Sequence, residues 1–230
     1  MKMRQRPAFT LVELLVVIAI VVILAALLFP VYARVRAAAG DAMTISNCRQ
    51  LGLSFHLYMD DFDDVYPQAA DGTPGQNQSG GWIYYSNFGN THAGTFEPDK
   101  GSLYPYVNSK YIYMSPADND ANISGDSFAM NGVLTTWNGT GLNPGRVASS
   151  VANPAGTMLV GEEGTGSPSF LLYGYVNGTN DAYFNPPSDH FGKFHPGGSA
   201  ILFCDGHSKI MHAEENFIST VCGSPTICYH

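Results

Sequence analysis

One carboxylate lies inside the longest apolar run of the sequence. Glu13 comes shortly after Phe9 and is followed by Leu14–Phe29, a run without any polar side chain. A charged side chain within an apolar segment is costly unless it meets a cation, and such residues usually serve a function. The sequence therefore predicts that Glu13 pairs with a positive charge.

A histidine and an aspartate in the C-terminal part of the chain are candidates for a catalytic pair. His195 precedes the apolar run Ser199–Cys204, and Asp205 with Gly206 follows it. If that run is a straight strand, which advances about 3.3 Å per residue, the two side chains lie far beyond hydrogen-bond reach. We therefore expect His195 to anchor a loop by a hydrogen bond. Asp205 and Gly206, between two apolar runs, indicate a hairpin turn.

Charge and motifs argue against two classes of function. The formal net charge is −8 and the Lys and Arg residues form no basic patch, so nucleic acid is not an indicated partner. The signatures G-x-S-x-G and H-E-x-x-H are absent, and a hydrolase needs a nucleophile near a base and a group that orients the base. We therefore expect a protein that is not an enzyme.

Two of the four cysteines are close together near the C-terminus. Cys222 and Cys228 enclose a short segment, and the sequence contains no C-x-x-C pair typical of a zinc or redox site. If this part of the chain lies outside the cytoplasm, a disulfide between them would close a small loop and stabilise the fold by about 2 kcal/mol. Two free thiols are the alternative.

The apolar run belongs to an N-terminal helix of membrane-spanning length. Residues 9–31 supply the roughly 20 apolar residues that a transmembrane helix needs. After Pro30, which should kink or locally melt the helix, apolar or small residues recur every three or four positions, and this spacing predicts an amphipathic helix over residues 32–64. Three cations precede the run and favour a cytoplasmic N-terminus: Lys2, Arg4 and Arg6.

An ordinary cleaved signal peptide and a plain single-pass anchor are the alternatives for this segment. The small residues 37–39 would suit a signal peptidase, but Pro30, Arg34 and Arg36 separate them from an apolar run that is already long for such a signal. A plain anchor leaves Glu13 unexplained.

Residues 65–230 have the texture of a β-rich domain with long loops. Gly, Pro and Asn become frequent, and short runs with strand character alternate with polar stretches. The predicted fold class is α+β, with a small antiparallel sheet packed on the second half of the N-terminal helix. The expected strands are Trp82–Ser86, Tyr111–Met114, Ser127–Met130, Thr157–Gly161, Ser169–Val176, Ser199–Cys204 and His207–His212.

The segment Ala8-Phe9-Thr10-Leu11-Val12-Glu13 resembles the class III signal of type IV prepilins. In that family a dedicated peptidase cuts on the cytoplasmic side, just before a Phe, and methylates the new amino group. The resemblance implies a leader peptide over residues 1–8 and a cut between Ala8 and Phe9. It also implies that Glu13 faces the Phe9 ammonium of a neighbouring subunit. Ala8 is a departure, because the family normally has Gly before the cut.

A second resemblance is to a prepilin subfamily defined by a His, nine residues and then Asp-Gly. His195, Asp205 and Gly206 have this spacing, over residues 195–206, and Ser127–Asn131 fits the same subfamily. The head of such proteins is a pilin-like domain.

Calcium is the cofactor that this resemblance makes worth considering. Related pseudopilins can bind it through loop carboxylates, and oxygen ligands of this kind suit the ion. Asp118, Glu162 and Asp205 are the candidate ligands here. The sequence contains no D-x-D-x-D-G loop, so no complete ligand set follows and no cofactor is required.

Together the resemblances imply a structural filament subunit, of a type IV pilus-like filament or a type II secretion pseudopilus. The precursor is expected as a single-pass protein of the inner (cytoplasmic) membrane with its head outside the cytoplasm, and the mature chain in a periplasmic or cell-surface filament. Expected partners are further copies of the chain, the prepilin peptidase and the assembly machinery. The alternative is a membrane-anchored surface binding protein or enzyme that only borrows the signal.

Overall fold

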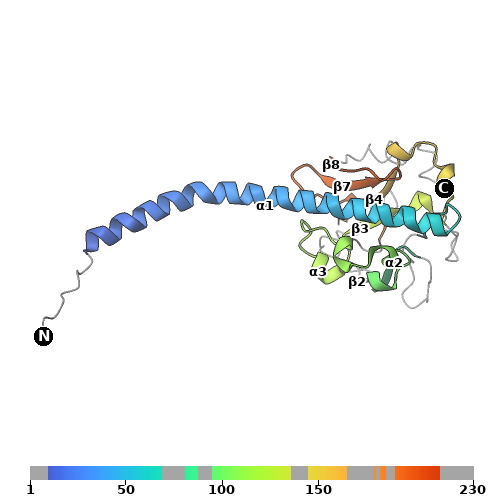
Figure 1. Cartoon of the computed structure of the whole chain (residues 1–230), viewed down its shortest axis with the longest axis horizontal. Coiled ribbons are helices and arrows are strands. Elements are labelled where there is room, and N and C mark those ends of the chain that lie inside the picture. The colour runs from blue at the N-terminus through green and yellow to red at the C-terminus, as the bar shows by residue number, and fades with distance from the viewer. Residues whose placement is uncertain are drawn as a thin grey trace, which may run out of the picture. The chain divides into compact units, whose positions relative to one another are not determined.

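The computed structural model describes residues 10–68, 81–87, 95–135, 145–164, 179, 182–184 and 190–212. The chain divides into two units, Met1–Ala39 and Gly40–His230. One helix, α1 (Leu11–Asp61), begins in the first unit and ends in the second (Figure 1).

In the first unit α1 has no buried face. Its large apolar side chains are exposed from Leu11, at 78%, to Val35, at 60%. Among the described residues, α1 is the one helix that is long and apolar enough to cross a membrane, which confirms the predicted apolar helix. Of the two effects expected at Pro30, local melting does not occur, because the chain stays helical on both sides. A proline removes a single backbone donor, and the turns around it keep their own hydrogen bonds.

From Gly40 onward α1 is amphipathic and packs on a sheet. Its buried residues recur at steps of one to four positions along one face: Thr44, Asn47, Cys48, Leu51, Gly52, Ser54, Phe55 and Met59. The helix ends at Asp61, slightly before the expected end at residue 64. Asp63 and Asp64 stop it by taking left-handed φ values of 52° and 62°, a conformation that Asp tolerates better than most residues.

The main sheet has six strands, in the order β5-β3-β4-β7-β8, with β6 also paired to β4. Its pairs are antiparallel except for β3 with β5, which is parallel. The sheet is therefore mixed where a purely antiparallel one was expected. A parallel pair needs a long connection, and the chain between β3 and β5 is long enough to hold β4 as well. The bounds are β3 (Phe128–Asn131), β4 (Met158–Gly164), β5 (Tyr183–Phe184), β6 (His190–Phe191), β7 (Ser199–Phe203) and β8 (Ser208–Met211).

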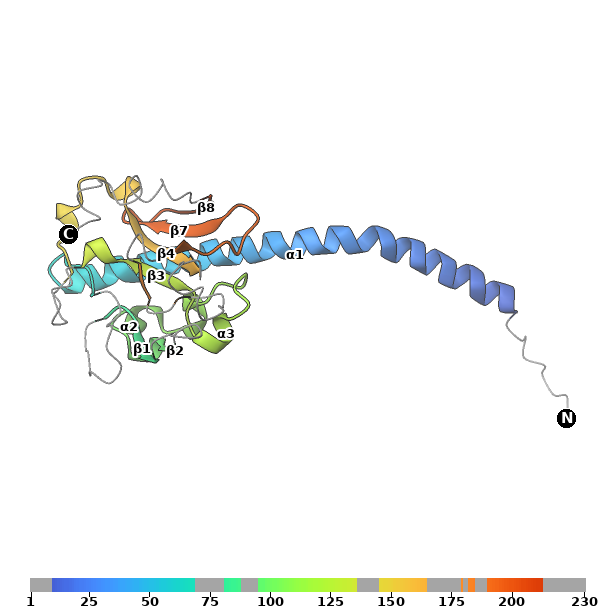
Figure 2. The same ribbon diagram turned by 180° about the vertical axis from the view of Figure 1, so that it is seen from behind.

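A second, two-stranded sheet pairs β1 (Tyr84–Asn87) with β2 (Thr95–Glu97), with a shift of register between Tyr85 and Asn87. Figure 2 shows β1, β2, α2 and α3 on one side of the Gly40–Asp61 part of α1, with β7 and β8 on the other. The short helical turns are η1 (Pro98–Lys100), α2 (Tyr104–Val107), η2 (Lys110–Tyr113), α3 (Ala121–Ser124), η3 (Gly132–Leu134), η4 (Ala148–Ser150) and η5 (Pro154–Gly156).

One expected strand is wrong and one lies outside the described residues. The segment Tyr111–Met114 forms the 3₁₀ turn η2 and not a strand. Within it Tyr111 is exposed while Ile112 and Tyr113 are both buried, a pattern that does not alternate as a half-buried strand would. The expected strand Ser169–Val176 is among the residues that the structure does not describe.

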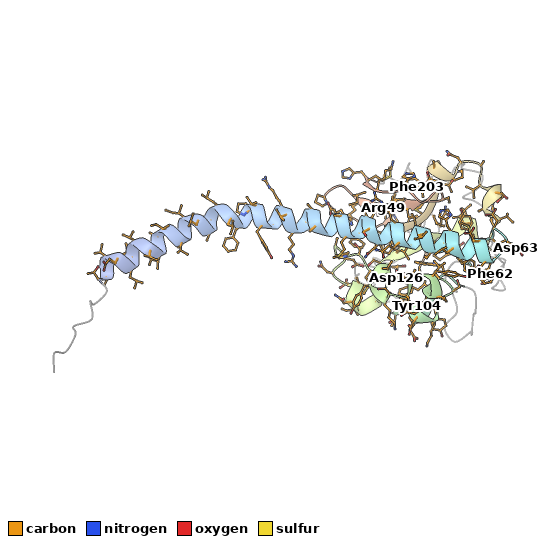
Figure 3. The ribbon with its side chains drawn as sticks, in the orientation of Figure 1. Arg49, Phe62, Asp63, Tyr104, Asp126 and Phe203 are labelled. Carbon is orange, nitrogen blue, oxygen red and sulfur yellow. The ribbon has the colours of Figure 1, made fainter. Side chains whose placement is uncertain are left out.

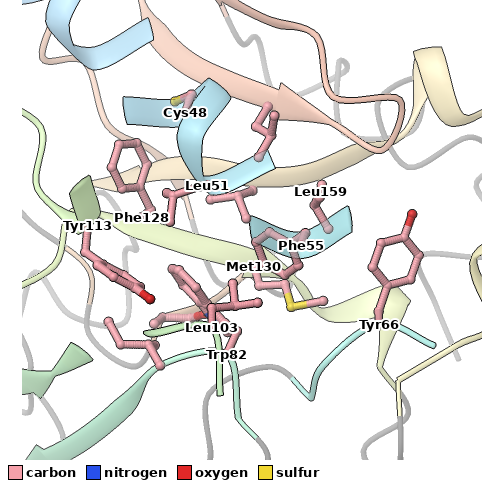
Figure 4. Close-up of a cluster of buried hydrophobic side chains, with 14 of the residues drawn as sticks. Cys48, Leu51, Phe55, Tyr66, Trp82, Leu103, Tyr113, Phe128, Met130 and Leu159 are labelled. Atoms are coloured by element: carbon pink, nitrogen blue, oxygen red, sulfur yellow. The ribbon is translucent and has the colours of Figure 1, made fainter. Parts of the chain in front are cut away.

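The main core fills the space between α1 and the sheet. The Phe55 ring of α1 lies 6.0 Å from the Trp82 ring at an angle of 31°, and the Trp82 ring stacks on Tyr113 at 5.8 Å (Figure 4). The Trp82 Nε1 donates a hydrogen bond to the Ala182 carbonyl oxygen at 3.2 Å. Burying side chains of this size stabilises the fold by roughly 1.5–3 kcal/mol each. A smaller cluster packs on the main sheet as well: Ala129, Met158, Phe184, Ile201 and Phe203.

Candidate functional site

Thr10 and Glu13 form a capping box at the start of α1. The Glu13 N–H donates to Thr10 Oγ1 at 3.3 Å, and the Thr10 N–H and hydroxyl both donate to Glu13 Oε2, at 2.8 and 2.7 Å. In this motif the N-cap hydroxyl and the carboxylate three residues later satisfy two backbone donors that the helix leaves open. The Thr-x-x-Glu spacing is a recognisable signal for it, which the sequence analysis missed.

The capping box holds Glu13 in place without burying it. Thr10 and Glu13 are both exposed, and both hydrogen bonds from Thr10 end on the same carboxylate oxygen. A carboxylate accepts up to about four hydrogen bonds. Glu13 can therefore keep its contacts with Thr10 and still accept a cationic donor from another chain.

The apolar side chains of the helix around Glu13 are exposed to solvent in the single chain. Figure 3 shows its side chains projecting on all sides of the first-unit helix. Leu24 is 62% exposed and Phe29 is 72% exposed, and soluble monomers rarely expose continuous apolar patches of this extent. This part of α1 is therefore suited to a surrounding of lipid or of other protein chains.

Four residues of the predicted sites lie outside the described part of the chain. They are the two residues of the expected cut and the two cysteines of the expected disulfide: Ala8, Phe9, Cys222 and Cys228. The described cysteines, Cys48 and Cys204, are both buried free thiols.

His195 is a buried bridge between α1 and β4. Its Nδ1 lies 2.6 Å from Oδ1 of Asp41, and its Nε2 lies 3.0 Å from Oε1 of Glu162. The His195 and Glu162 side chains are fully buried, whereas Asp41 is 35% exposed. The structure confirms a hydrogen-bonded anchor at His195. Its partners could not be predicted, because Asp41 is 154 residues away in the sequence.

The surroundings favour a positive charge on this histidine. Burial alone would lower the pKa of His195, but the hydrogen bonds and charges of Glu162 and Asp41 outweigh it and raise the pKa above its ordinary value. Glu162 Oε2 also accepts the Ala200 N–H at 2.6 Å. Burial, followed by the charge of Glu162, raises the pKa of the nearby Cys48 thiol.

Asp205 and Gly206 form the turn between β7 and β8, as predicted. The Gly206 N–H donates to the Phe203 carbonyl at 2.9 Å, and Gly206 has a left-handed φ of 88° that favours glycine. Asp205 Oδ1 accepts the backbone N–H of His207 at 3.1 Å and lies 2.6 Å from His207 Nδ1. Asp205 and His195 therefore have separate hydrogen-bond partners.

The carboxylates considered for calcium also have separate partners. Asp118 accepts the Ser127 hydroxyl at 2.7 Å and the Asp120 N–H at 2.9 Å, and Glu162 is occupied by His195 and Ala200. In the part of the chain that the structure describes, no group of three His, Cys, Asp or Glu side chains is arranged to hold a metal. The described geometry thus does not fit a calcium ion shared by these residues, and calcium binding stays an untested prediction.

Residues 3–29 match the family model described as the prokaryotic N-terminal methylation motif. No curated protein and no solved structure matches the chain. The matched segment contains the expected cut site, the capping box and the apolar part of α1. The chain therefore carries a prepilin-type signal on a helix suited to membrane anchoring, which favours a structural subunit over an enzyme. The match ends before the head and does not reach the segment 195–206.

Proposed function

We propose that the chain is a pilin-like filament subunit, made as a membrane precursor and assembled through α1. The observation that carries this proposal is the methylation motif over residues 3–29, which coincides with a fully exposed apolar helix that presents Glu13 at its start. An anchor alone requires neither the carboxylate nor the methylation signal. A subunit packed in a filament uses both.

Processing would create a cationic partner for the Glu13 carboxylate. Cutting between Ala8 and Phe9 frees an amino group, and methylation leaves that group cationic. In a filament the Phe9 ammonium of one subunit meets the Glu13 carboxylate of the next. A buried charge is tolerated when it is paired, so this contact would fix how far neighbouring helices are shifted along the filament axis.

The same proposal covers location and partners. The N-terminal cations keep the leader in the cytoplasm, where a prepilin peptidase removes residues 1–8, and the head lies on the other side of the inner membrane. An assembly machinery then moves the mature chain into a type IV pilus-like filament or a type II secretion pseudopilus. The core of that filament would cover the apolar side chains of residues 11–35.

Mass spectrometry of the mature N-terminus tests the processing step. The chain is purified from membranes of cells that contain a prepilin peptidase, and its N-terminal peptide is sequenced. We expect a chain that begins at Phe9 and carries one N-methyl group. An intact Met1, or a start near Gly40 as an ordinary signal peptidase would leave, contradicts the proposal.

Substitution of Glu13 tests the assembly step. Gln supports a capping box as Glu does, so Glu13→Gln removes the charge and little else. We expect the variant to insert and be cut normally while the yield of sheared surface filaments falls at least about tenfold, since one partner of a buried pair is lost.

The matched control is Thr10→Val, which weakens the helix cap by about 1 kcal/mol and leaves the carboxylate charged. This variant should still form filaments. Wild-type filament yield from Glu13→Gln would show that the charge has no part in assembly and would leave an anchored surface protein as the better explanation.

A further inference from the structure

The segment His195–Gly206 contacts α1 at both of its ends. At the first end His195 meets Asp41, near the start of the packed half of the helix. At the second end Gly206 lies against the helix further along, where a Cβ on Gly206 would come within 3.3 Å of His56 Nε2. The strand β7 joins these two ends.

The first contact is polar, and its His195 and Glu162 side chains are fully buried. Both ring nitrogens of His195 face carboxylate oxygens, Asp41 at 2.6 Å and Glu162 at 3.0 Å. A neutral imidazole has one N–H and cannot donate to both, so this geometry requires one additional proton shared among His195, Asp41 and Glu162. The two contacts of His195 together tie α1 to β4 and to the segment itself.

A tight turn presents this histidine. His195 and Gly198 exchange backbone hydrogen bonds of 3.2 and 3.0 Å. Gly198 has a φ of 114°, and a Cβ there would lie 2.2 Å from the Met211 carbonyl oxygen, so only glycine fits. The turn directs His195 toward the helix at the point where β7 begins.

The second contact is a close approach of two backbones. A Cβ on Gly52 would lie 2.9 Å from Leu202 Cδ1 and 3.7 Å from Gly206 Cα. A Cβ at Gly52 would press on the buried Leu202, and one at Gly206 would be strained by the left-handed φ of 88° and would crowd His56, so a larger residue at either position disturbs this contact. Ser208, just after the turn, adds a hydrogen bond of 3.4 Å from its hydroxyl to the Ile45 carbonyl of α1.

The segment is long enough to reach both contacts. From Asp41 to Gly52 the helix advances about 16 Å at 1.5 Å per residue. The five residues of β7 span four steps, about 13 Å at 3.3 Å per residue, and the turn residues on either side of the strand cover the remainder. The nine residues between His195 and Asp205 therefore hold a short turn and a strand that together span the two points on the helix.

We propose that the segment His195–Gly206 is a two-point clasp for the packed half of α1, with His195 as its polar point and Gly206 as its packed point. The clasp gives the spacing of His, nine residues and Asp-Gly a physical role that is independent of filament assembly. His195 acts as a positioning residue, because it fixes the helix on the sheet.

The titratable groups around the polar point decide how the clasp responds to pH. They are Asp41 and Cys48 from α1, Glu162 from β4, and Asp118, whose pKa is raised by burial and, as the smallest cause, by the charge of Glu162. Loss of the shared proton removes one hydrogen bond and leaves Glu162 buried without a cation, which is unfavourable. The hold on α1 is thus strongest below the ordinary histidine pKa and weakens as the pH rises through the raised pKa of the folded protein.

Cys48 reports directly on separation of α1 from the sheet, since it is 1% exposed in the core beneath the helix. The full chain in detergent micelles is treated with an alkylating reagent, and the Cys48 peptide is quantified by mass spectrometry. His195→Gln should increase the alkylation rate of Cys48 about 100-fold over wild type at pH 6, as expected when one member of a buried pair is removed. The ratio of the variant's alkylation rate to the wild-type rate should fall toward one by pH 9.5.

His207→Gln is the matched control, because His207 also contacts an aspartate at 2.6 Å but is 43% exposed on the turn. It should leave the alkylation rate of Cys48 unchanged. Gly206→Ala, at the packed point, should increase that rate equally at both pH values. A ratio for His195→Gln that does not change with pH, or an equal effect of His207→Gln, would overturn the proposal.

A measurement on the wild type guards against a variant that fails to fold. The ¹⁵N chemical shifts of histidine-labelled full-length protein in micelles report whether each ring is charged. The proposal expects His195 to be protonated on both nitrogens at pH 7. Chemical shifts that show a neutral His195 ring at that pH, with only one nitrogen protonated, would contradict it.

Discussion

Asp126 is fully buried, and one of its carboxyl oxygens lacks a hydrogen-bond partner within the described residues. The other oxygen accepts the N–H groups of Ser127 and Phe128 at 2.9 and 3.1 Å. Burial raises the pKa of Asp126 well above its ordinary value despite these two hydrogen bonds. The side chain therefore fits the fold best in its neutral form.

The pH dependence that follows has a definite sign. An unfolded Asp titrates near about 3.9, and the folded pKa of Asp126 is higher, so its contribution to stability falls as pH rises from about 4 through that folded pKa. Asp126→Asn removes this titration. The melting temperature of the variant relative to wild type should rise steadily between about pH 4 and pH 8.

Thermal unfolding of the full chain in detergent over a pH series measures this difference. Asp60→Asn, at an exposed position of α1, is the control and should follow the wild-type curve. A difference between Asp126→Asn and wild type that stays constant over the series would show that Asp126 keeps its charge when buried.

At the scale of elements, two glycines in α1 have opposite surroundings. A Cβ at Gly40 would meet nothing within 4 Å, whereas one at Gly52 would lie 2.9 Å from Leu202 Cδ1. Glycine costs a helix interior about 1 kcal/mol relative to alanine. At Gly40 packing does not explain why the helix has a glycine. At Gly52 the close contact with Leu202 of the sheet explains it.

Alanine substitution should therefore separate the two positions. Gly40→Ala should stabilise the helix by about 1 kcal/mol. Gly52→Ala should destabilise the head by about 1–2 kcal/mol, because overpacking against the buried Leu202 outweighs the gain in propensity. Denaturant unfolding in detergent gives both values, and Leu202→Val combined with Gly52→Ala should recover part of the loss. Equal effects at the two glycines would contradict the close approach.

Sequence patterns predicted the elements that depend on local periodicity. The apolar and amphipathic halves of α1, the strands β3, β4, β7 and β8, and the turn at Asp205 and Gly206 follow from spacing and turn chemistry. The parallel pair of β3 with β5 could not be predicted in this way, because β5 has two residues and depends on a distant partner.

The contacts of the candidate sites likewise fall into local ones, which the sequence can predict, and long-range ones, which it cannot. The capping box of Thr10 and Glu13 is a local contact, and the four-residue pattern Thr-x-x-Glu is enough to predict it. The partners of His195 come from two elements far away in the chain, and nothing in the sequence near His195 indicates Asp41. Sequence alone therefore predicts the kind of contact that His195 makes but neither of its partners.

For the whole molecule, the two units need different surroundings. The first unit presents only apolar side chains over Leu11–Phe29 apart from Glu13, and this stretch is about 28 Å long at 1.5 Å per residue, close to the thickness of a bilayer core. The second unit has a buried core, and its exposed large apolar side chains are scattered and fewer than those of the first unit within the described residues. The continuous apolar surface of the chain therefore belongs to the first unit.

Protease protection in sealed vesicles tests this division. The precursor, inserted into lipid vesicles and digested from outside, should leave a protected fragment that contains Leu11–Phe29, because a bilayer core excludes the protease. Mass spectrometry identifies the fragment, and opening the vesicles with detergent before digestion should abolish it. Complete digestion of this segment in sealed vesicles would show that it lies outside the bilayer.

The position of Asp41 has a mechanical consequence. The chain passes from the first unit to the second at Ala39 and Gly40, and Asp41, which His195 holds, is the next residue. Tension applied to the membrane end of α1 therefore loads the His195 contact before it loads the hydrophobic rows at Cys48 and Leu51. A pull on that end would separate the contact between His195 and Asp41 first, while the buried core around Cys48 and Leu51 stays closed.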